Sequence, residues 1–451
     1  MRCVVALVLI GWAQDTLFLD PRKRLHYYEL LHKRPGWVIL GYPVVGYDAL
    51  RGIGAALTVS VAHNGKRTDP LFAYQPYKHY FFLQVGFFVR DSRYMRFLYD
   101  APWINQKPYR INLRLNYRTE SQGQFWGIGE QYLKVFLPRS IQKYEKQLKA
   151  PILSPRGEWE THVARHYFYQ EQWQFWIIGE RVEKGGLFRL LGGIRGVREK
   201  VTSLAGRTYT LYEPGGSKIQ ATQQATLLDS AKEGLIFSPP LVYYTIGNWQ
   251  TRVFAGGAWI WDSRDFEISS NSGWVIEVGH ESQIPSFQVH KSYFSFRYFH
   301  TFYHSANGKV AFVGAFHGLI SAVYGSCLPF LELYTYSRWS EGRIINLLTG
   351  PSTVRAFREN RFVVPFSYLF QYEIRSRVAE LNIFRQHLTG GPIFFVDIAT
   401  GTDHFFNIPK GVIYGVGIGG RVLWNMTTVL RADIAYGKEG WQFHFGTGHI
   451  F

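Results

Sequence analysis

Few residues in this sequence combine types and spacing that could do chemistry. His280, Glu281 and Ser282 are consecutive, and a Ser/His/acid set of this kind could hydrolyse an ester. His300 and His304 are the other local candidates, as metal ligands. They share one face of an alternating segment with aromatic residues, and four residues along a strand span about 13 Å, which is too far for one metal ion. We therefore expect no enzyme activity, no metal and no cofactor.

The elements that carry these residues show a period of two. In 362–374 one face holds aromatic and aliphatic residues, and the other holds small or polar residues, including Gln371 and Glu373. A period of two predicts a strand with one apolar face. The same pattern recurs in 392–400, 412–424, 427–436 and 441–451. Amphipathic strands in series, ending on the aromatic residue Phe451, are typical of a closed barrel in a lipid bilayer.

Alternation of this kind runs through the rest of the chain and predicts about sixteen strands in all. The earlier segments are 37–47, 52–62, 77–89, 92–99, 109–117, 162–178, 186–194, 250–261, 273–280, 288–304 and 309–320. Long connections are expected at 124–160, 202–234 and 321–361. Counted back from a periplasmic C-terminus, the short turns at 307–308 and 425–426 fall on the periplasmic side. The long connection 321–361 then falls on the outer face.

The composition of the 451 residues agrees with a membrane barrel. Only 18% of them are charged, against about a quarter in an ordinary soluble protein, and 17% are aromatic. After the N-terminus no segment has the ~18 consecutive apolar residues of a membrane-spanning helix. We therefore predict that the chain crosses the membrane as strands.

The net charge of +17 allows two interpretations. It could attract anionic partners such as lipopolysaccharide, phospholipid headgroups or an acidic polypeptide. Alternatively, the exposed loops and turns are simply rich in Lys and Arg. Nucleic acid is not an expected partner, because the basic residues are scattered through aromatic alternation and not gathered on one helix or loop.

The first residues resemble an export signal. Residues 1–13 have a basic start at Arg2, an apolar core and small residues before a predicted cleavage after Ala13. Removal of this segment takes away Cys3 and leaves Cys327 without a partner for an intramolecular disulfide. We predict a signal peptide at 1–13, a short periplasmic segment at 14–35 and a barrel at 36–451.

Four motifs follow one another along the chain: Asp100-Ala101-Pro102, Trp126-Gly127-Ile128-Gly129, Asp262-Ser263-Arg264-Asp265 followed by Gly273, and Val354-Arg355-Ala356-Phe357. Together, and in this order, they resemble the bacterial surface antigen family of BamA-like outer-membrane assembly and translocation barrels. The resemblance covers roughly 46–451. It implies an all-β, transmembrane antiparallel barrel in the bacterial outer membrane, with a long outer loop folded into the lumen.

The resemblance also assigns roles to residues. The loop motif at 354–357 matches a lid whose Arg pairs with acids of the inner wall, here Glu373 and Asp397. A guanidinium in a partly dry lumen needs carboxylate partners and can bind two at once. From spacing alone, Arg355 could equally be an ordinary loop cation. The family has Gly where Ala356 stands, so a positive φ at this position would cost about 1 kcal/mol.

The last predicted strand carries Phe443, Phe445 and Phe451 on one face, with glycines on the other. In the family this strand is both the recognition signal for barrel insertion and one side of the closing seam. Because glycines weaken the packing of a strand, we expect a loose seam with the first strand. The other interpretation is that barrels of this membrane in general end on an aromatic residue.

The resemblance implies insertion or translocation of polypeptide, or of lipid, across the outer membrane. The family usually carries periplasmic polypeptide-transport-associated repeats, whereas only about twenty residues precede the first strand predicted here. We therefore expect a barrel-only member that docks its substrate through a separate periplasmic or lipoprotein subunit. The basic residues Arg22, Lys23, Arg24, Lys33 and Arg34 are candidates for that contact or for binding membrane phosphates. The alternative is a passive pore or structural barrel, which an open lumen would favour over a plugged one.

Overall fold

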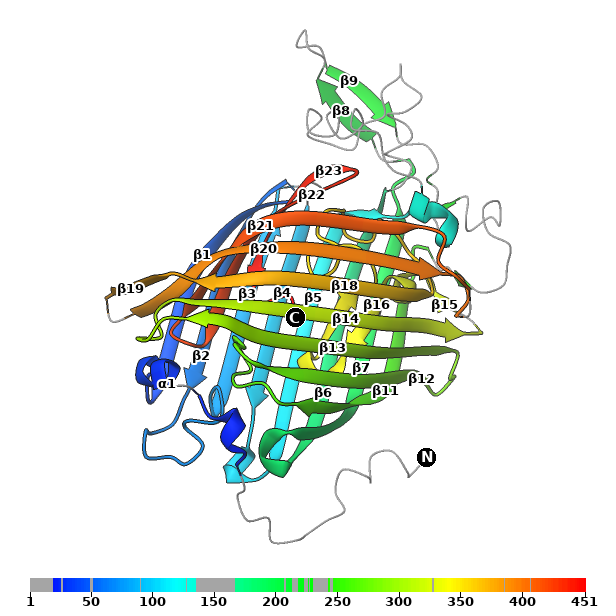
Figure 1. The fold of residues 1–451 in the computed structure, drawn as a ribbon. Coiled ribbons are helices and arrows are strands. Elements are labelled where there is room, and N and C mark those ends of the chain that lie inside the picture. The colour runs from blue at the N-terminus through cyan, green and yellow to red at the C-terminus, as the bar shows by residue number, and fades with distance from the viewer. Residues whose placement is uncertain are drawn as a thin grey trace.

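The computed structural model describes residues 19–134, 167–212 and 246–451, without 26, 49–51, 90, 127, 207, 327, 385 and 406, and the short pieces 218–222, 226, 228–229 and 242–243. Sixteen antiparallel strands, each paired with the next along the chain, form a nearly closed barrel (Figure 1). They are β1 (Trp37–Asp48), β2 (Gly52–His63), β3 (His79–Phe88), β4 (Ser92–Ala101), β5 (Tyr109–Gln124), β6 (Tyr167–Glu183), β7 (Phe188–Ser203), β11 (Trp249–Asp262), β12 (Gly273–Ile284), β13 (Val289–His304), β14 (Ala311–Gly325), β18 (Phe366–Arg377), β20 (Gln386–Thr402), β21 (Val412–Trp424), β22 (Thr428–Gly437) and β23 (Gly440–Thr447).

Short elements join or extend these strands. β19 (Ala379–Ile383) pairs with the start of β20, and three two-stranded sheets form separately from the main sheet. These pairs are β8 (Thr208–Tyr212) with β9 (Lys218–Thr222), β10 (Val242–Tyr243) with β15 (Leu328–Pro329), and β16 (Thr335–Arg338) with β17 (Arg343–Asn346). The helical turns are η2 (Pro21–Lys23), α1 (Tyr27–His32), η3 (Ile104–Gln106), η4 (Glu130–Lys134), η5 (Lys184–Gly186), η6 (Phe330–Tyr334) and η7 (Trp339–Glu341). Within the described part of the chain, no helix is long and apolar enough to cross a membrane.

The two faces of the barrel wall differ because the strands alternate. On β13, Phe294 and Tyr298 point outward and are about four-tenths exposed, whereas Lys291 and Arg297 point inward and are buried. Exposed large apolar side chains recur on strands around the ring, among them Ile39, Leu57, Leu83, Ile177, Phe370, Phe394 and Ile418. An apolar outer band around a charged interior is the pattern of a transmembrane barrel, because lipid meets only the outer side chains.

The segment before β1 packs on one end of the barrel, which we call the N-terminal rim. Leu25 is buried against Phe266 and Met426, which belong to turns of that rim. Lys33 is buried and its Nζ donates to the carbonyl oxygens of Phe72 and Gln75, at 2.6 and 2.5 Å. The part of the predicted 14–35 segment that the structure describes is thus attached to the barrel. The predicted signal peptide lies outside the described residues.

The first and last strands meet without a hydrogen-bonded register. In the described residues β1 pairs only with β2, and β23 pairs only with β22. The side chain of Phe445 on β23 instead lies next to the backbone of Gly46 on β1: a Cβ placed on Gly46 would lie 3.7 Å from Cβ of Phe445. Pro43 stands within β1, and proline is tolerated at an edge strand because it has no N–H to donate. The barrel therefore has a seam between β1 and β23.

Each predicted strand corresponds to one strand of the ring, but several predicted ends are wrong. β5, β7 and β12 run on to Gln124, Ser203 and Ile284, past the predicted ends at 117, 194 and 280. Two other segments are wrong at an end that carries apolar residues. The segment 362–374 becomes extended only at Phe366, because Phe362, Val363 and Val364 are buried in the loop packing inside the barrel. The segment 441–451 ends as a strand at Thr447, and the last residues turn into the lumen. Apolar character alone does not distinguish a lipid-facing residue from one in an apolar core, which explains both errors.

Candidate functional site

The connection from β14 to β18 fills part of the barrel interior, and we call its residues 326–365 the lumen loop. Figure 1 shows its yellow segment, with β16, inside the ring of strands. The described residues from Leu331 to Leu348 and from Thr353 to Arg358 are mostly buried. Its apolar side chains Leu347, Leu348, Val354, Phe357 and Phe362 join one cluster with inward residues of the wall. Burial of these groups holds the loop inside the barrel.

Arg355 is the most enclosed cation of the loop, with no exposed surface. Its Nε and Nη2 donate to the two carboxylate oxygens of Asp397, both at 2.8 Å, and its Nη1 donates to Glu373 at 2.7 Å. The guanidinium carbon lies 3.4 Å from the centroid of the Phe395 ring. The geometry is bidentate, charge-assisted and shielded from water, so these bonds are of the strong kind.

A third acid, Asp433 on β22, lies 3.5 Å from Nη1 of Arg355 and was not among the residues predicted from the sequence. Arg421 links the acids, since it pairs with Asp433 at 2.6 Å and with Glu373 at 3.3 Å. Arg375 adds a bond to Glu373 at 2.8 Å. The alternation in β22 could have revealed Asp433, because this residue precedes the outward Ile434 and must therefore point inward.

The motif residue Ala356 does not take a positive φ, so the backbone strain considered for this position is absent. Its methyl group instead packs against two glycines of the wall. A Cβ on Gly437 would lie 2.7 Å from Cβ of Ala356, and one on Gly415 would lie closer still. The motif neighbours Val354 and Phe357 are fully buried, and Phe357 packs edge-on against Phe362, with centroids 5.3 Å apart.

The Trp126 motif meets the end of the lumen loop. The guanidinium of Arg361 lies 4.5 Å from the Trp126 ring, and its Nε donates to Glu439 at 2.9 Å. The amide of Gly129 donates to the carbonyl oxygen of Val363 at 3.0 Å. The Trp126 motif thus contacts residues of the lumen loop that lie more than 200 positions further along the chain.

The first part of the lumen loop carries an acid that binds basic residues of the barrel wall, the reverse of the pairing around Arg355. Glu332 of the loop accepts from Arg195 on β7 at 3.0 Å and pairs with Lys291 on β13 at 2.5 Å. Burial raises the pKa of Glu332, but Arg195 and Lys291 outweigh it and hold that pKa below its ordinary value. The loop thus places an acid against a basic part of the wall and Arg355 against an acidic part. None of these three partners was predicted from the sequence.

The strand-end motif lies on the N-terminal rim, where β11 ends. Asp262 accepts two bonds from the side chain of Arg264, at 3.1 and 2.8 Å, and pairs with Lys23 at 2.8 Å. Asp265 accepts from the amides of Asn271 and Ser272, at 3.0 and 3.2 Å, which fixes the turn to β12. The motif therefore shapes a turn and anchors the N-terminal segment.

The aromatic residues of the C-terminal segment divide between the two faces. Phe443 and Phe445 point outward, but Phe451 is buried, so the prediction that the three share one face is wrong. The Phe451 ring stacks on His317 with centroids 5.1 Å apart, and its carbonyl accepts from Arg375 at 3.2 Å. Residue 451 thus contributes to packing inside the barrel.

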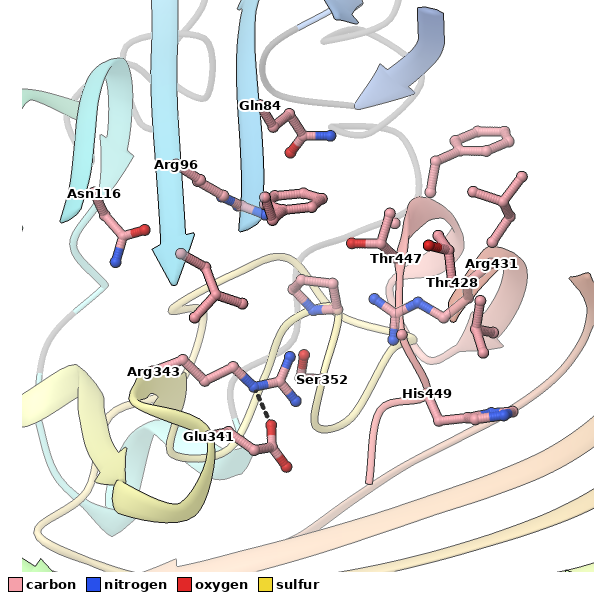
Figure 2. Close-up of a pocket in the computed structure, with 18 of the residues that line it drawn as sticks. Gln84, Arg96, Asn116, Glu341, Arg343, Ser352, Thr428, Arg431, Thr447 and His449 are labelled. Carbon is pink, nitrogen blue, oxygen red and sulfur yellow. Dashed lines mark ion pairs between the residues drawn. The ribbon is translucent and has the colours of Figure 1, made fainter. Parts of the chain in front are cut away.

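A cavity of about 1020 Å³ remains in the lumen beside the loop. Figure 2 shows that its wall combines side chains of the first strands, of the loop and of the last strands, such as Arg96, Arg343 and Arg431. Arginines far outnumber carboxylates among the lining residues, and Glu341, which pairs with Arg343, is one of the few acids. The cavity is therefore electropositive.

The residues considered for catalysis do not form a complete set. Ser282 Oγ lies 2.9 Å from Nε2 of His280 and 2.8 Å from Nδ1 of His290 on the outer face. Glu281 points into the lumen, where it binds Arg195 at 2.7 Å, so it cannot orient these histidines. Nδ1 of His280 contacts Ser292. His300 and His304 are exposed on the outer face of β13.

A family model described as a domain of unknown function (DUF5982) matches residues 15–78. No protein of curated function matches the sequence. Several solved structures are similar. Among them, the alignment with BamA from Haemophilus ducreyi lacking POTRA domains 1-3 has 11% sequence identity, covers 92% of this chain and 70% of that chain, and gives a TM-score of 0.47. The alignment with CdiB from Acinetobacter baumannii has 10% identity, covers 93% of this chain and 66% of that chain, and gives a TM-score of 0.45. The alignment with the beta domain of the Bordetella autotransporter Brka has 9% identity, covers 92% of this chain and 98% of that chain, and gives a TM-score of 0.26. At these values the likenesses carry no functional argument, and the barrel architecture rests on the strand pairing itself.

Proposed function

We propose that this chain is a bacterial outer-membrane barrel of the BamA-like kind, which inserts or translocates polypeptide, or lipid, with the help of a separate periplasmic or lipoprotein subunit. The observation that carries the proposal is the lumen loop, fixed inside the barrel by Arg355 among Asp397, Glu373 and Asp433. A loop that is buried and bound in this way occupies part of the lumen and narrows what remains of it. A passive pore is expected to keep an open lumen, so a loop anchored there by buried ion pairs favours the assembly barrel over the pore.

The seam supports the same function. Strands that meet through side chains and not through a ladder of hydrogen bonds can separate at lower cost, because fewer backbone groups lose a partner. An opening between β1 and β23 would let a polypeptide strand or a lipid pass between the lumen and the bilayer. In this proposal the contact of Phe445 with Gly46 belongs to the closed state of the seam and is lost when the seam opens.

The N-terminal segment is where we place the contact with the separate subunit. Lys23 pairs with Asp262, and Lys33 donates to backbone carbonyl oxygens of the barrel, so neither is available to a partner or to membrane phosphates. Of the basic residues considered for that contact, Arg22 and Arg24 are exposed. These two cations are our candidates for contact with the subunit or with anionic lipid headgroups.

The experiment locks the seam. Gly46 and Phe445 are both replaced by cysteine, and Cys327→Ser removes the other cysteine that remains once the predicted export signal with Cys3 is cleaved. The two new Cβ atoms would lie about 3.7 Å apart, within the range of a disulfide. Cells that depend on this protein are then compared in oxidising and reducing medium for the levels of other outer-membrane proteins and of surface lipid. Loss of either on oxidation, with recovery on reduction, supports the proposal.

Each single cysteine variant serves as a control for the loss of Gly46 or of Phe445. Normal levels of protein and lipid in cells whose seam is fully oxidised would contradict the proposal. A steady ion conductance from the locked and the unlocked barrel alike would then favour the passive pore.

A further inference from the structure

The lumen cavity has more cationic side chains at its wall than the acids around it can balance. Twelve arginines and five acidic residues line it. Several of these arginines pair with acids that lie behind the wall, as Arg297 does with Glu277 at 2.8 Å. Glu341, at the wall itself, is shared between Arg343 at 2.5 Å and Arg338 at 3.0 Å. The acids near the cavity are thus already in use, and positive charge is left over at its wall.

Two arginines of the wall make no hydrogen bond to a carboxylate of the described residues. Arg114 on β5 donates only to Oδ1 of Asn112, at 3.0 Å. Arg431 on β22 comes only within 3.7 Å of a carboxylate oxygen of Asp433, which binds Arg421 at 2.6 Å. The Arg431 side chain is 7% exposed, yet its Nε has no hydrogen-bond partner within the described part of the chain. A guanidinium withdrawn from water without an anion is costly, so these two arginines indicate an anionic ligand.

Arginines from β4, β5, β22 and the lumen loop border the same space. Arg96 of β4 and Arg114 of β5 are diagonal neighbours on the inward faces of paired strands. From the lumen loop, a Cβ on Gly342 would lie 2.9 Å from Nε of Arg114, so the next residue, Arg343, is close by. Figure 2 shows Arg96, Arg343 and Arg431 around one space. A phosphate in this space has several oxygens that can accept hydrogen bonds from guanidinium groups.

An apolar strip lies between these arginines and the seam. Val44 of β1, Phe82 of β3 and Leu98 of β4 line the cavity. All three are only partly buried and pack on the apolar cluster that the inward face of β1 forms. In the strand register Phe82 lies opposite Leu98, and Leu98 lies opposite Arg114. The wall of the cavity thus changes from apolar to cationic between the seam and β5.

We propose that this cavity binds a lipid with an anionic phosphate headgroup. The phosphate accepts hydrogen bonds from the arginines, chiefly Arg114 and Arg431, and an acyl chain lies along the apolar strip toward β1. The cavity volume of about 1020 Å³ is at the upper end of the ~300–1,000 Å³ that is usual for ligand pockets. Burial of the acyl chain against apolar side chains adds affinity that a free phosphate lacks.

The seam gives such a lipid a route to the bilayer. Gly46 of β1 and Phe445 of β23, which meet at the seam, both line the cavity. A polypeptide in the same place would bring backbone N–H and C=O groups to the apolar strip, which offers them no partner, whereas an acyl chain has no such groups. This proposal rests on the proposed function and narrows it, since it names a phosphate lipid, and not a polypeptide, as what the barrel moves.

The test titrates the full chain in detergent with phosphatidylglycerol and counts the lipids that stay bound by native mass spectrometry. We expect one lipid per chain and at least about a tenfold loss of affinity in Arg114→Gln and in Arg431→Gln, the effect of losing one charge-assisted hydrogen bond. Arg198→Gln is the matched control, because Arg198 is an exposed arginine on the outer face of β7, over the Trp249 ring at 5.1 Å. It reports on lipids that only surround the barrel. Heat-modifiable migration confirms that each variant is folded.

Competition on the unaltered chain gives a readout that does not depend on the folding of a variant. Diacylglycerol with the same acyl chains should not bind, and inorganic phosphate should displace phosphatidylglycerol only at much higher concentration than the lipid. Equally tight binding of diacylglycerol would overturn the proposal, because the arginines then play no part. Displacement by inorganic phosphate or by polyglutamate at the concentration of the lipid would overturn it as well, in favour of a simple anion or an acidic polypeptide. Equal affinity in Arg114→Gln, Arg431→Gln and the natural sequence has the same consequence.

This inference and the proposed function can fail separately. If locking the seam in cells lowers surface lipid or outer-membrane protein but the purified chain binds no phosphatidylglycerol, the cavity is not the lipid site and the proposed function stands. If the purified chain binds the lipid through Arg114 and Arg431 but the locked seam changes nothing in cells, the lipid site stands and the proposed function is contradicted.

Discussion

The guanidinium of Arg355 binds both carboxylate oxygens of Asp397, with Nε–Oδ2 and Nη2–Oδ1 distances of 2.8 Å. The backbone amide of Arg355 also donates to Oδ2 of Asp397, at 3.1 Å. One residue of the lumen loop is thus joined to one residue of β20 by three hydrogen bonds. Because Arg355 and Asp397 are fully buried, the closed loop depends on this pair more than on any exposed contact.

Arg355→Ala should release the loop. It leaves Asp397 buried without its cation, which costs about 3–5 kcal/mol. We expect a lower urea midpoint of the folded barrel, faster protease cleavage in the lumen loop and a higher ion conductance. Arg22→Ala is the control, because Arg22 pairs with Asp20 while 66% of its side chain is exposed. An unchanged midpoint in Arg355→Ala would show that the buried pair does not hold the loop.

Gly415→Ala should destabilise the barrel, because the new methyl group would overlap Cβ of Ala356. Overpacking of this kind costs about 1–3 kcal/mol. The second change Ala356→Gly should restore most of the loss, and Gly420→Ala on the same strand should have little effect, since a Cβ there meets nothing within 4 Å. Urea unfolding of Gly415→Ala, Ala356→Gly, the double variant and Gly420→Ala measures the coupling. Additive losses in the double variant would contradict the packing described for the loop motif.

Lys33 should make the stability of the barrel depend on pH. Burial lowers the pKa of Lys33 to about 7, with Asp69 opposing the shift. The unfolded chain keeps an ordinary lysine pKa of about 10.4, so between pH 7 and that value it binds a proton that the folded chain lacks. The free energy of unfolding therefore rises with pH across this window, by at most about 1.4 kcal/mol per unit, and is constant below it. Lys33→Met should remove this slope in urea unfolding at pH 7 to 9, and an equal slope in both proteins would refute the assignment.

Phe451→Ala should lower the stability of the assembled barrel by about 3–5 kcal/mol, because the ring is buried against His317 and Arg375. Phe443→Ala, at an outward aromatic position, should change it much less. The temperature at which the folded band disappears in a heat-modifiability gel compares the two. If only the yield of insertion falls and the stability of inserted Phe451→Ala is unchanged, this residue acts as a recognition signal and not as packing.

Any ion conductance of the barrel should favour anions. The cavity is lined by far more arginines than carboxylates, and rings of cationic side chains select anions in pores. Reversal potentials in a salt gradient should shift toward cations in Arg431→Glu, whose side chain lines the cavity, and should not shift in Arg22→Glu on the rim. Cation selectivity in the unaltered protein would show that current passes by another route.

The sequence alone predicted the class of fold and the existence of each strand in the ring. This was possible because alternation is local. An outward residue such as Phe370 and its inward neighbour Gln371 indicate a strand without reference to any other segment. The resemblance of the motif at 354–357 also pointed to Arg355, Glu373 and Asp397, three residues that the structure brings together.

Only the tertiary structure decided how the interior is filled. Phe362 and Phe451 have the same apolar character as lipid-facing residues, yet they are buried in the lumen, because the closed barrel offers them an apolar surface that no local pattern records. The pairs of Arg355 with Asp433 and of Glu332 with Arg195 join the lumen loop to β22 and β7, which the loop reaches only after the sheet has curved. The ring of His32, before β1, stacks on the ring of His387, at the start of β20, for the same reason. Strand alternation sets which way a side chain points, but the closure of the barrel sets what it meets there.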